Sequence, residues 1–261
     1  MYKVASLQVA ITDQETRAER LTRVENLLDQ CAGARLILLP EIWHVGYFSF
    51  EDYEAGSETL TGATISRIAA KAKQHNAYIL AGSMVEKAAE GLFNTSVLLN
   101  PKGEVIASYR KIHLFGYNSA EKELLRPGFH VVTVETELGV LGLSTCYDLR
   151  FPELFRSMVD KGAEVFLVCS AWPYPRVEHW VALNQVRAFE NQCFLISSNC
   201  AGVNRGRPFM GRSSVVDPWG TVLATAGDRE CIVKAEIDIS QVAAARREFP
   251  PLQDRMLKGQ G

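Results

Sequence analysis

Hydrophobic and polar positions alternate in two rhythms along the N-terminal part of the chain. Short apolar runs at residues 2–9, 35–39 and 78–81 predict strands. Between them lie two stretches with apolar residues at helical spacing, one ending at Cys31 and one over residues 64–75. Thr12 and Glu15 have the spacing of a capping box at the start of the first helix. This alternation of strands and helices is typical of an α/β protein.

The pattern changes after residue 94, where strand–turn–strand units appear. Residues 94–111 predict two strands around a Pro-Lys-Gly-Glu turn, and residues 213–225 repeat this around Asp-Pro-Trp-Gly. Such hairpins add antiparallel strands, so we expect mixed sheets. The other predicted elements are strands 129–134, 140–145, 164–169, 193–198 and 232–237, and helices 152–161 and 177–190. No linker divides residues 1–261, so we expect one domain with two packed sheets and helices outside them.

The composition limits the classes of function. The 261 residues are 47% hydrophobic and 22% charged, with a formal net charge of −2, as in an ordinary globular protein. There is no basic cluster for nucleic acid, no signal-peptide pattern, and no apolar run near the ~20 residues that span a bilayer. The six cysteines and five histidines show no metal-ligand spacing. We therefore expect a cytoplasmic protein with reduced thiols and no metal, membrane or nucleic-acid partner.

Three reactive side chains follow predicted strands. Glu41 comes directly after strand 35–39, Lys111 ends the first hairpin, and Cys146 ends strand 140–145. Taken singly, each has an ordinary interpretation as a loop glutamate, a solvated lysine or an inert buried thiol. Taken together they suit nucleophilic catalysis, because the thiol needs a base, which the glutamate can supply, and the attacked carbonyl needs a donor for its oxyanion, which the lysine can supply. The amide of Tyr147 is a candidate second donor, and we expect the following helix start to lower the thiol pKa.

The motifs around these residues resemble those of a known family. PEIW at 40–43, YRKIHLF at 109–115 and STCYDLRFPELFR at 144–156 resemble the nitrilase superfamily of carbon–nitrogen hydrolases. The resemblance implies that Glu41 is the general base, Lys111 the oxyanion stabiliser and Cys146 the nucleophile. It also implies a second glutamate in AEKELLRPG, at Glu121, with Glu123 as a near neighbour. The fold it implies is a four-layer α-β-β-α sandwich with two mixed β-sheets, assembled as a homodimer or a higher homo-oligomer.

Residues after the cysteine indicate a branch of this family. CYDLRFPE with AWP at 171–173 resembles the omega-amidases, which cleave the terminal amide of small 2-oxo acids such as 2-oxoglutaramate through a cysteine thioester, without a cofactor. N-carbamoyl amino acid hydrolases carry two adjacent arginines here, whereas this chain has Leu149-Arg150. Nitrilases have a Trp-Glu or similar pair where this chain has Tyr147-Asp148. A nitrilase, a carbamoyl hydrolase and a non-catalytic binding or scaffold member remain alternatives.

Four residues are candidates for substrate binding. Arg150 suits a substrate carboxylate, since a guanidinium pairs with it in bidentate fashion, but an ion pair with Asp148 or Glu153 is an equal alternative. Trp172 and Tyr47 are candidates for lining the pocket, and core packing explains them as well. Tyr147 completes the set through its amide. The expected partners are thus a small amide and water.

Overall fold

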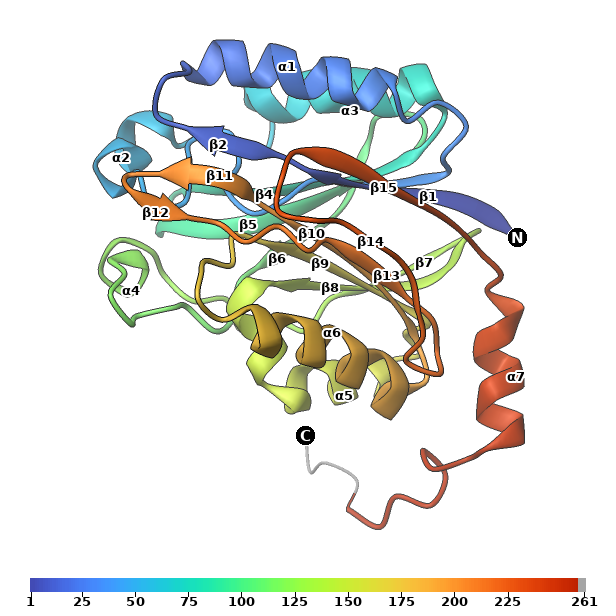
Figure 1. The fold of residues 1–261 in the computed structure, drawn as a ribbon. Helices are drawn as coiled ribbons and strands as arrows, with labels where there is room; N and C mark the ends of the chain where they lie inside the picture. Colours follow the sequence, from blue (N-terminus) through green and yellow to red (C-terminus); the bar gives the residue numbers. More distant parts are fainter. Residues whose placement is uncertain (258–261) are drawn as a thin grey trace.

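Two β-sheets pack face to face, and helices cover their outer faces (Figure 1). The computed structural model describes residues 1–257. The first sheet has the strand order β15-β1-β3-β4-β5-β6. Its strands are β1 (Tyr2–Gln8), β3 (Leu36–Leu38), β4 (Tyr78–Ala88), β5 (Gly91–Leu99), β6 (Val105–Arg110) and β15 (Cys231–Ile237). The strands β1, β3 and β4 are parallel, and their neighbours on both sides are antiparallel.

The second sheet repeats this plan. Its order is β14-β13-β10-β9-β8-β7, with β8, β9 and β10 parallel and antiparallel neighbours on both sides. Its strands are β7 (Thr133–Thr136), β8 (Gly139–Thr145), β9 (Val165–Ser170), β10 (Phe194–Asn199), β13 (Ser214–Val216) and β14 (Val222–Thr225). Both sheets are therefore mixed, as the two hairpins predicted.

Long helices form the outer layers. The first sheet is covered by α1 (Arg17–Asp29) and α3 (Ala63–His75), and the second by α5 (Pro152–Asp160) and α6 (Val177–Asn191) (Figure 1). Two further elements lie at the ends: α7 (Ser240–Glu248), and a small sheet of β2 (Ala10–Thr12), β11 (Ala201–Asn204) and β12 (Arg207–Pro208). The short elements are η1 (Phe50–Asp52), α2 (Tyr53–Gly56), α4 (Glu121–Leu124) and η2 (Cys146–Arg150).

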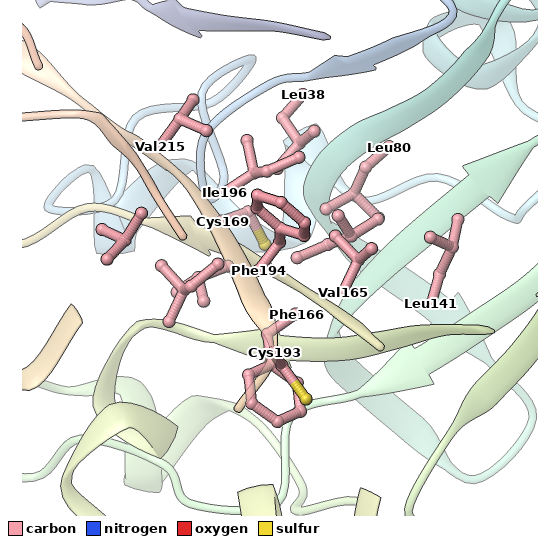
Figure 2. Close-up of a cluster of buried hydrophobic side chains, with 14 of the residues drawn as sticks. Leu38, Leu80, Leu141, Val165, Phe166, Cys169, Cys193, Phe194, Ile196 and Val215 are labelled. Atoms are coloured by element: carbon pink, nitrogen blue, oxygen red, sulfur yellow. The ribbon is translucent and has the colours of Figure 1, made fainter. Parts of the chain in front are cut away.

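Alternating side chains of each strand divide between two apolar layers. In Figure 2, Leu38 and Leu80 of the first sheet lie opposite Val165 and Ile196 of the second, which makes the layer between the sheets. The next residue along β9, Phe166, points the other way and packs edge-on against Phe155 of α5, with ring centroids 5.1 Å apart. The four-layer sandwich that the sequence predicted is confirmed.

Several local expectations are wrong. The capping box is formed by Thr16 and Glu19, four residues after the expected pair, so α1 begins later. The strand expected over 129–134 is instead β7, and Phe129 lies outside it with 81% of its surface exposed. Neither α7 nor the small sheet was expected. Those elements have no strong apolar period of their own, and contacts with distant segments stabilise them, such as that of Gln192 Nε2 with the carbonyl of Ala245.

Candidate active site

The ends of central parallel strands from both sheets meet at one rim of the sandwich. Glu41 follows β3, and its amide donates to the carbonyl of Ser170, at the end of β9, at 3.3 Å. Cys146 follows β8 directly. The backbone turns sharply at this rim, because Ile42 and Cys146 have φ angles of 42° and 50°, a region that residues with a Cβ rarely adopt. Each such residue costs about 1–3 kcal/mol, so the surrounding packing must hold these turns in place.

A fully buried ion cluster lies beside the cysteine. Lys111 Nζ, just after β6, is 2.8 Å from Glu41 Oε1 and 2.9 and 3.0 Å from the two carboxylate oxygens of Glu121 on α4. All three side chains are completely inaccessible to solvent. Asn94 of β5 joins the two glutamates, because its Nδ2 donates to Glu41 Oε1 at 2.8 Å and to Glu121 Oε1 at 2.7 Å. The structure thus brings together the three residues that the motifs predicted far apart in sequence.

The other carboxylate oxygen of Glu41 fixes the acid against the second sheet. Its Oε2 accepts a hydrogen bond from the amide of Ala171 at 2.8 Å. The Cys146 thiol is in contact with the same carboxylate and with the Ser170–Ala171 segment. Glu41 therefore stands between the ammonium of Lys111 and the sulfur, where it can accept the thiol proton.

Burial controls the protonation of this cluster. It raises the pKa of Glu41 above 4.5; the ammonium of Lys111 opposes the shift and Glu121 adds to it. Burial disfavours the charge of Lys111, but the two glutamates outweigh it and raise its pKa well above the ordinary value. Burial, followed by the charge of Glu41, raises the pKa of Cys146 well above 9.0. The expected lowering of the thiol pKa by a helix start is wrong, because the thiol is desolvated and begins only the five-residue 3-10 helix η2.

Asp148 ties the loop of the lysine to the loop of the cysteine. This buried carboxylate accepts from the Thr145 amide at 2.9 Å and the Tyr109 hydroxyl at 2.7 Å. It also contacts His113 twice, at the amide (3.1 Å) and at Nδ1 (2.7 Å). Tyr109 and His113 flank Lys111 in sequence, and Thr145 precedes Cys146. Asp148 therefore fixes the distance between the two reactive groups.

A narrow pocket opens above the sulfur. Its volume is about 20 Å³, little more than a single water needs. It is lined by all four residues expected to bind substrate and by several neighbours: Tyr47, Phe115, Cys146, Tyr147, Arg150, Ala171, Trp172, Pro173 and Arg176. A larger cavity of about 750 Å³, lined in part by Glu86 and Arg110, contains none of the catalytic candidates.

The four expected binding residues differ in how they are held. The Arg150 guanidinium lies 4.8 Å above the ring of Trp172 and 3.2 Å from Nδ1 of His179, and forms no ion pair within residues 1–257. The alternative pairing with Asp148 or Glu153 is therefore absent from this part of the chain. Tyr47 is buried, and its hydroxyl donates to Glu121 at 3.1 Å, so it holds the second glutamate as well as lining the pocket.

Sequence reasoning missed two residues that hold the cluster and several that line the pocket, Arg176 among them. Asn94 stands in a strand without any distinguishing motif, and only the fold places it between two glutamates. Asp148 was considered as a partner of Arg150 and as part of the Tyr147-Asp148 pair that marks the branch, but not as a residue that holds the site, although its position two residues after the cysteine is a usable signal. Arg176 lies in the loop before α6, where it has no local pattern.

Two kinds of feature are absent from the described part of the chain. Within residues 1–257, no group of His, Cys, Asp and Glu side chains has the arrangement of a metal site. None of the helices described there has both the length and the apolar character needed to cross a bilayer.

Known sequences are similar to this chain over nearly its whole length. Residues 3–247 match the family model for carbon-nitrogen hydrolase. The chain is 36% identical over 260 residues to a 2-oxoglutaramate amidase of Paenarthrobacter nicotinovorans, which covers 97% of this chain and 88% of the relative. It is 34% identical over 270 residues to a deaminated glutathione amidase of Synechocystis, with 98% of both chains covered.

Solved structures are similar as well. A CN-hydrolase superfamily protein of Xanthomonas campestris, with an arsenic adduct in its active site, gives a TM-score of 0.92 at 28% identity, over 100% of this chain and 99% of that one. A mutant amidase of Nesterenkonia sp. AN1, with acrylamide joined by Michael addition to its active-site cysteine, gives a TM-score of 0.84 at 26% identity, covering 97% of this chain and 100% of that one.

Proposed function

The chain belongs to the carbon–nitrogen hydrolase family, and from that premise we propose that it is an omega-amidase that converts 2-oxoglutaramate and water to 2-oxoglutarate and ammonia. It is a hydrolase of carbon–nitrogen bonds in linear amides, acting through a cysteine nucleophile. The observation that carries the proposal is the buried Glu41–Lys111–Glu121 cluster in contact with Cys146, below a pocket that holds an arginine.

The first half of the proposed reaction forms a thioester. Glu41 takes the thiol proton as the sulfur of Cys146 attacks the amide carbon, so the thiolate never exists as a free buried anion. This coupling follows from the charges: Glu41, Glu121 and Lys111 already sum to −1 when ionised, and a thiolate would make −2. Glu41 then returns the proton to the nitrogen, the carbon–nitrogen bond breaks, and ammonia leaves.

The second half releases the acid. Glu41 takes a proton from water, the hydroxide attacks the thioester carbon, and the carbon–sulfur bond breaks as the sulfur recovers the proton. In both halves, the oxyanion is stabilised by the Lys111 ammonium and by the amide of Tyr147. A donor of this kind typically contributes about 10²–10³ in rate. Glu121 keeps Lys111 charged and in place, with its two contacts at 2.9 and 3.0 Å.

The residues of the pocket wall suit the binding of a substrate that carries a carboxylate. Arg150 has no protein carboxylate to pair with in the described residues, and stacking on Trp172 holds its guanidinium at the pocket. We assign it the substrate carboxylate. Tyr47 and Trp172 supply flat apolar walls for the short carbon chain between the reacting amide and the carboxylate.

The proposed activity is tested by ammonia release from 2-oxoglutaramate. Wild-type protein should release ammonia, and Cys146→Ala should release none while keeping the wild-type circular dichroism spectrum. Cys231→Ser is the matched control, because this half-buried cysteine lies on the far strand β15 and should leave turnover unchanged. Parallel assays with a nitrile and an N-carbamoyl amino acid test the two alternative reactions. Ammonia release that persists in Cys146→Ala contradicts the assignment, and no turnover of any substrate favours the scaffold alternative.

We further propose that the protein works as a single domain, in the cytoplasm, as a homodimer or higher homo-oligomer. All six cysteines are free thiols, which suits a reducing compartment. Val181 and Phe189 on α6, together with Trp219 on the turn before β14, leave apolar surface exposed on one outer face. Such a face suits contact with a second copy, and light scattering measures the assembly size.

A further inference from the structure

The cavity of about 750 Å³ is separate from the catalytic pocket and is large enough for a small organic molecule. Ligand pockets typically enclose about 300–1,000 Å³, and this cavity shares no residue with the pocket above the sulfur. We call it the outer cavity. Its residues are Leu60, Glu86, Glu90, Phe93, Ser108, Arg110, Arg126, Pro127, Gly128, Phe129, His130 and Val132.

The alternation of side chains along two strands places this cavity behind the catalytic cluster. Phe93 of β5 and Arg110 of β6 line the cavity, whereas the next residues, Asn94 and Lys111, belong to the cluster. Successive side chains of a strand point to opposite faces of a sheet. Val97, on the same face of β5 as Phe93, packs in the apolar layer that includes α1 and α3. The outer cavity therefore lies on the outer face of the first sheet, and a ligand bound there leaves the catalytic pocket open.

An arginine at this cavity has no side-chain partner in the described chain. The Arg126 guanidinium forms neither a hydrogen bond nor an ion pair with any of residues 1–257. Its side chain lies across Gly91, where a Cβ would stand 2.8 Å from Arg126 Nε, so this crossing requires glycine. The main chain holds the arginine there, because its amide donates to the carbonyl of Leu92 at 2.8 Å. All the N–H groups of the guanidinium are thus available to a ligand.

A carboxylate without a close partner lies on the other side of Gly91. Glu90 is in the turn between β4 and β5, and its side chain is 62% exposed. Its Oε2 lies 3.9 Å from Nη2 of Arg110, which is too long for a hydrogen bond. That guanidinium is already engaged by Glu86, at 2.8 and 2.9 Å. Glu90 and Arg126 are therefore opposite charges that are both open to a ligand.

Apolar side chains of the same cavity remain in contact with water. Phe129 is 81% exposed, and Leu60 and Val132 are only partly buried. A large exposed aromatic side chain beside a cavity is a common feature of binding surfaces. The cavity thus offers one cation, one anion and an apolar wall.

We propose that the outer cavity binds a free α-amino acid with a large apolar side chain. Its carboxylate pairs with Arg126, its ammonium pairs with Glu90, and its side chain packs against Phe129. An α-amino acid carries both charges on one carbon atom, which matches two opposite charges on the two sides of a single glycine. The proposal goes beyond the amidase function and does not depend on the identity of the amide substrate.

Four related ligands test each part of this site by calorimetry. The reference is L-phenylalanine, and the others lack one feature each: 2-phenylethylamine has no carboxylate, 3-phenylpropionate has no ammonium, and L-alanine has no ring. Loss of the carboxylate should raise the Kd about ten-fold, as for a charge-assisted hydrogen bond. Loss of the ammonium should raise it about three-fold, because Glu90 is exposed. Loss of the ring should raise it about ten-fold through lost apolar contact.

Two variants assign these preferences to the two charged residues. Glu90→Gln should abolish the preference for L-phenylalanine over 3-phenylpropionate and keep the preference over 2-phenylethylamine. Arg126→Gln should do the reverse. Arg247→Gln on α7, outside the cavity, is the matched control and should keep both ratios. Since each variant keeps one preference, loss of the fold cannot produce the expected pattern.

Three results overturn the outer-cavity proposal. They are undetectable binding of L-phenylalanine to the wild-type protein, equal Kd values for the four ligands, and unchanged ratios in both variants. Saturating L-phenylalanine should also leave the KM for the hydrolysed amide unchanged, and a raised KM would place the ligand in the catalytic pocket instead. A protein that shows the expected Kd pattern but does not hydrolyse 2-oxoglutaramate contradicts only the proposed function.

Discussion

Replacing Asn94 by aspartate should disable the active site with almost no change in shape. Asn94 Nδ2 donates to both Glu41 and Glu121, at 2.8 and 2.7 Å, as does the ammonium of Lys111. Aspartate removes both donors and places a third carboxylate next to the other two. With all groups ionised, the buried cluster would change from a net charge of −1 to −2, with Lys111 as its single cation.

The size of the effect follows from these contacts. A hydrogen bond to a charged group contributes about 1.5–3 kcal/mol, so losing two costs about 3–6 kcal/mol. Where this loss falls on the transition state, kcat/KM decreases by about 10²–10⁴. The new aspartate can escape repulsion by staying protonated, and it then donates to one glutamate. Activity of the variant should therefore recover partly at acidic pH, where the wild-type protein loses activity.

The assay is kcat/KM for 2-oxoglutaramate as a function of pH, with unfolding monitored in parallel. Asn26→Asp on the exposed face of α1 is the matched control, because it adds the same charge far from the cluster. Wild-type kcat/KM and an unshifted pH profile in Asn94→Asp would refute the idea that Asn94 relieves repulsion between the two glutamates.

Two further results are expected. Because burial and Glu121 raise the pKa of Glu41, and the base must be ionised to accept the thiol proton, kcat/KM of the wild-type protein should rise with pH through an apparent pKa above 4.5. Lys111→Met removes the positive charge that lowers the pKa of Glu41, so the rise of its residual kcat/KM with pH should move to higher pH. A wild-type kcat/KM that rises through an apparent pKa at or below 4.5 contradicts this reasoning. Asp148→Ala should lower the free energy of unfolding by about 3–5 kcal/mol in urea titrations, since it leaves several buried donors unpaired. Tyr109→Phe removes one of those donors and should cost only about 1 kcal/mol, so equal effects of the two variants argue against Asp148 as the centre of the network.

The reactive residues could be predicted because local sequence marks them. Glu41 and Cys146 each follow a short apolar strand, and the ends of such strands in α/β sheets are where sites gather. Lys111 and Glu121 were placed by motif, and α4 does bring Glu121 to the lysine. Apolar periods and hairpin turns predicted an α/β protein with two packed, mixed sheets, and the family resemblance implied the four-layer sandwich.

Properties that depend on several distant segments could not be predicted in this way. The bridging position of Asn94 requires β5, β3 and α4 to be in place, and a polar residue in a strand carries no mark of that. Whether the pKa of the Cys146 thiol is raised or lowered depends on how deeply the whole fold buries the sulfur, which a strand–helix boundary in the sequence does not reveal. Thr12 and Thr16 are both residue types that cap helices, and Thr16 is the cap because α1 begins at Arg17.

The two sheets share one topology, and catalysis needs residues from both of them. One sheet and its connections contribute the acid–base group and the cation, while the other contributes the sulfur and the amide that clamps Glu41. A fragment that ends between β6 and β7 would hold Glu41 and Lys111 without Cys146, and it would lack β15 of its own sheet. Turnover therefore reports the joining of the two halves, and fragments split between them should regain activity only on reassociation.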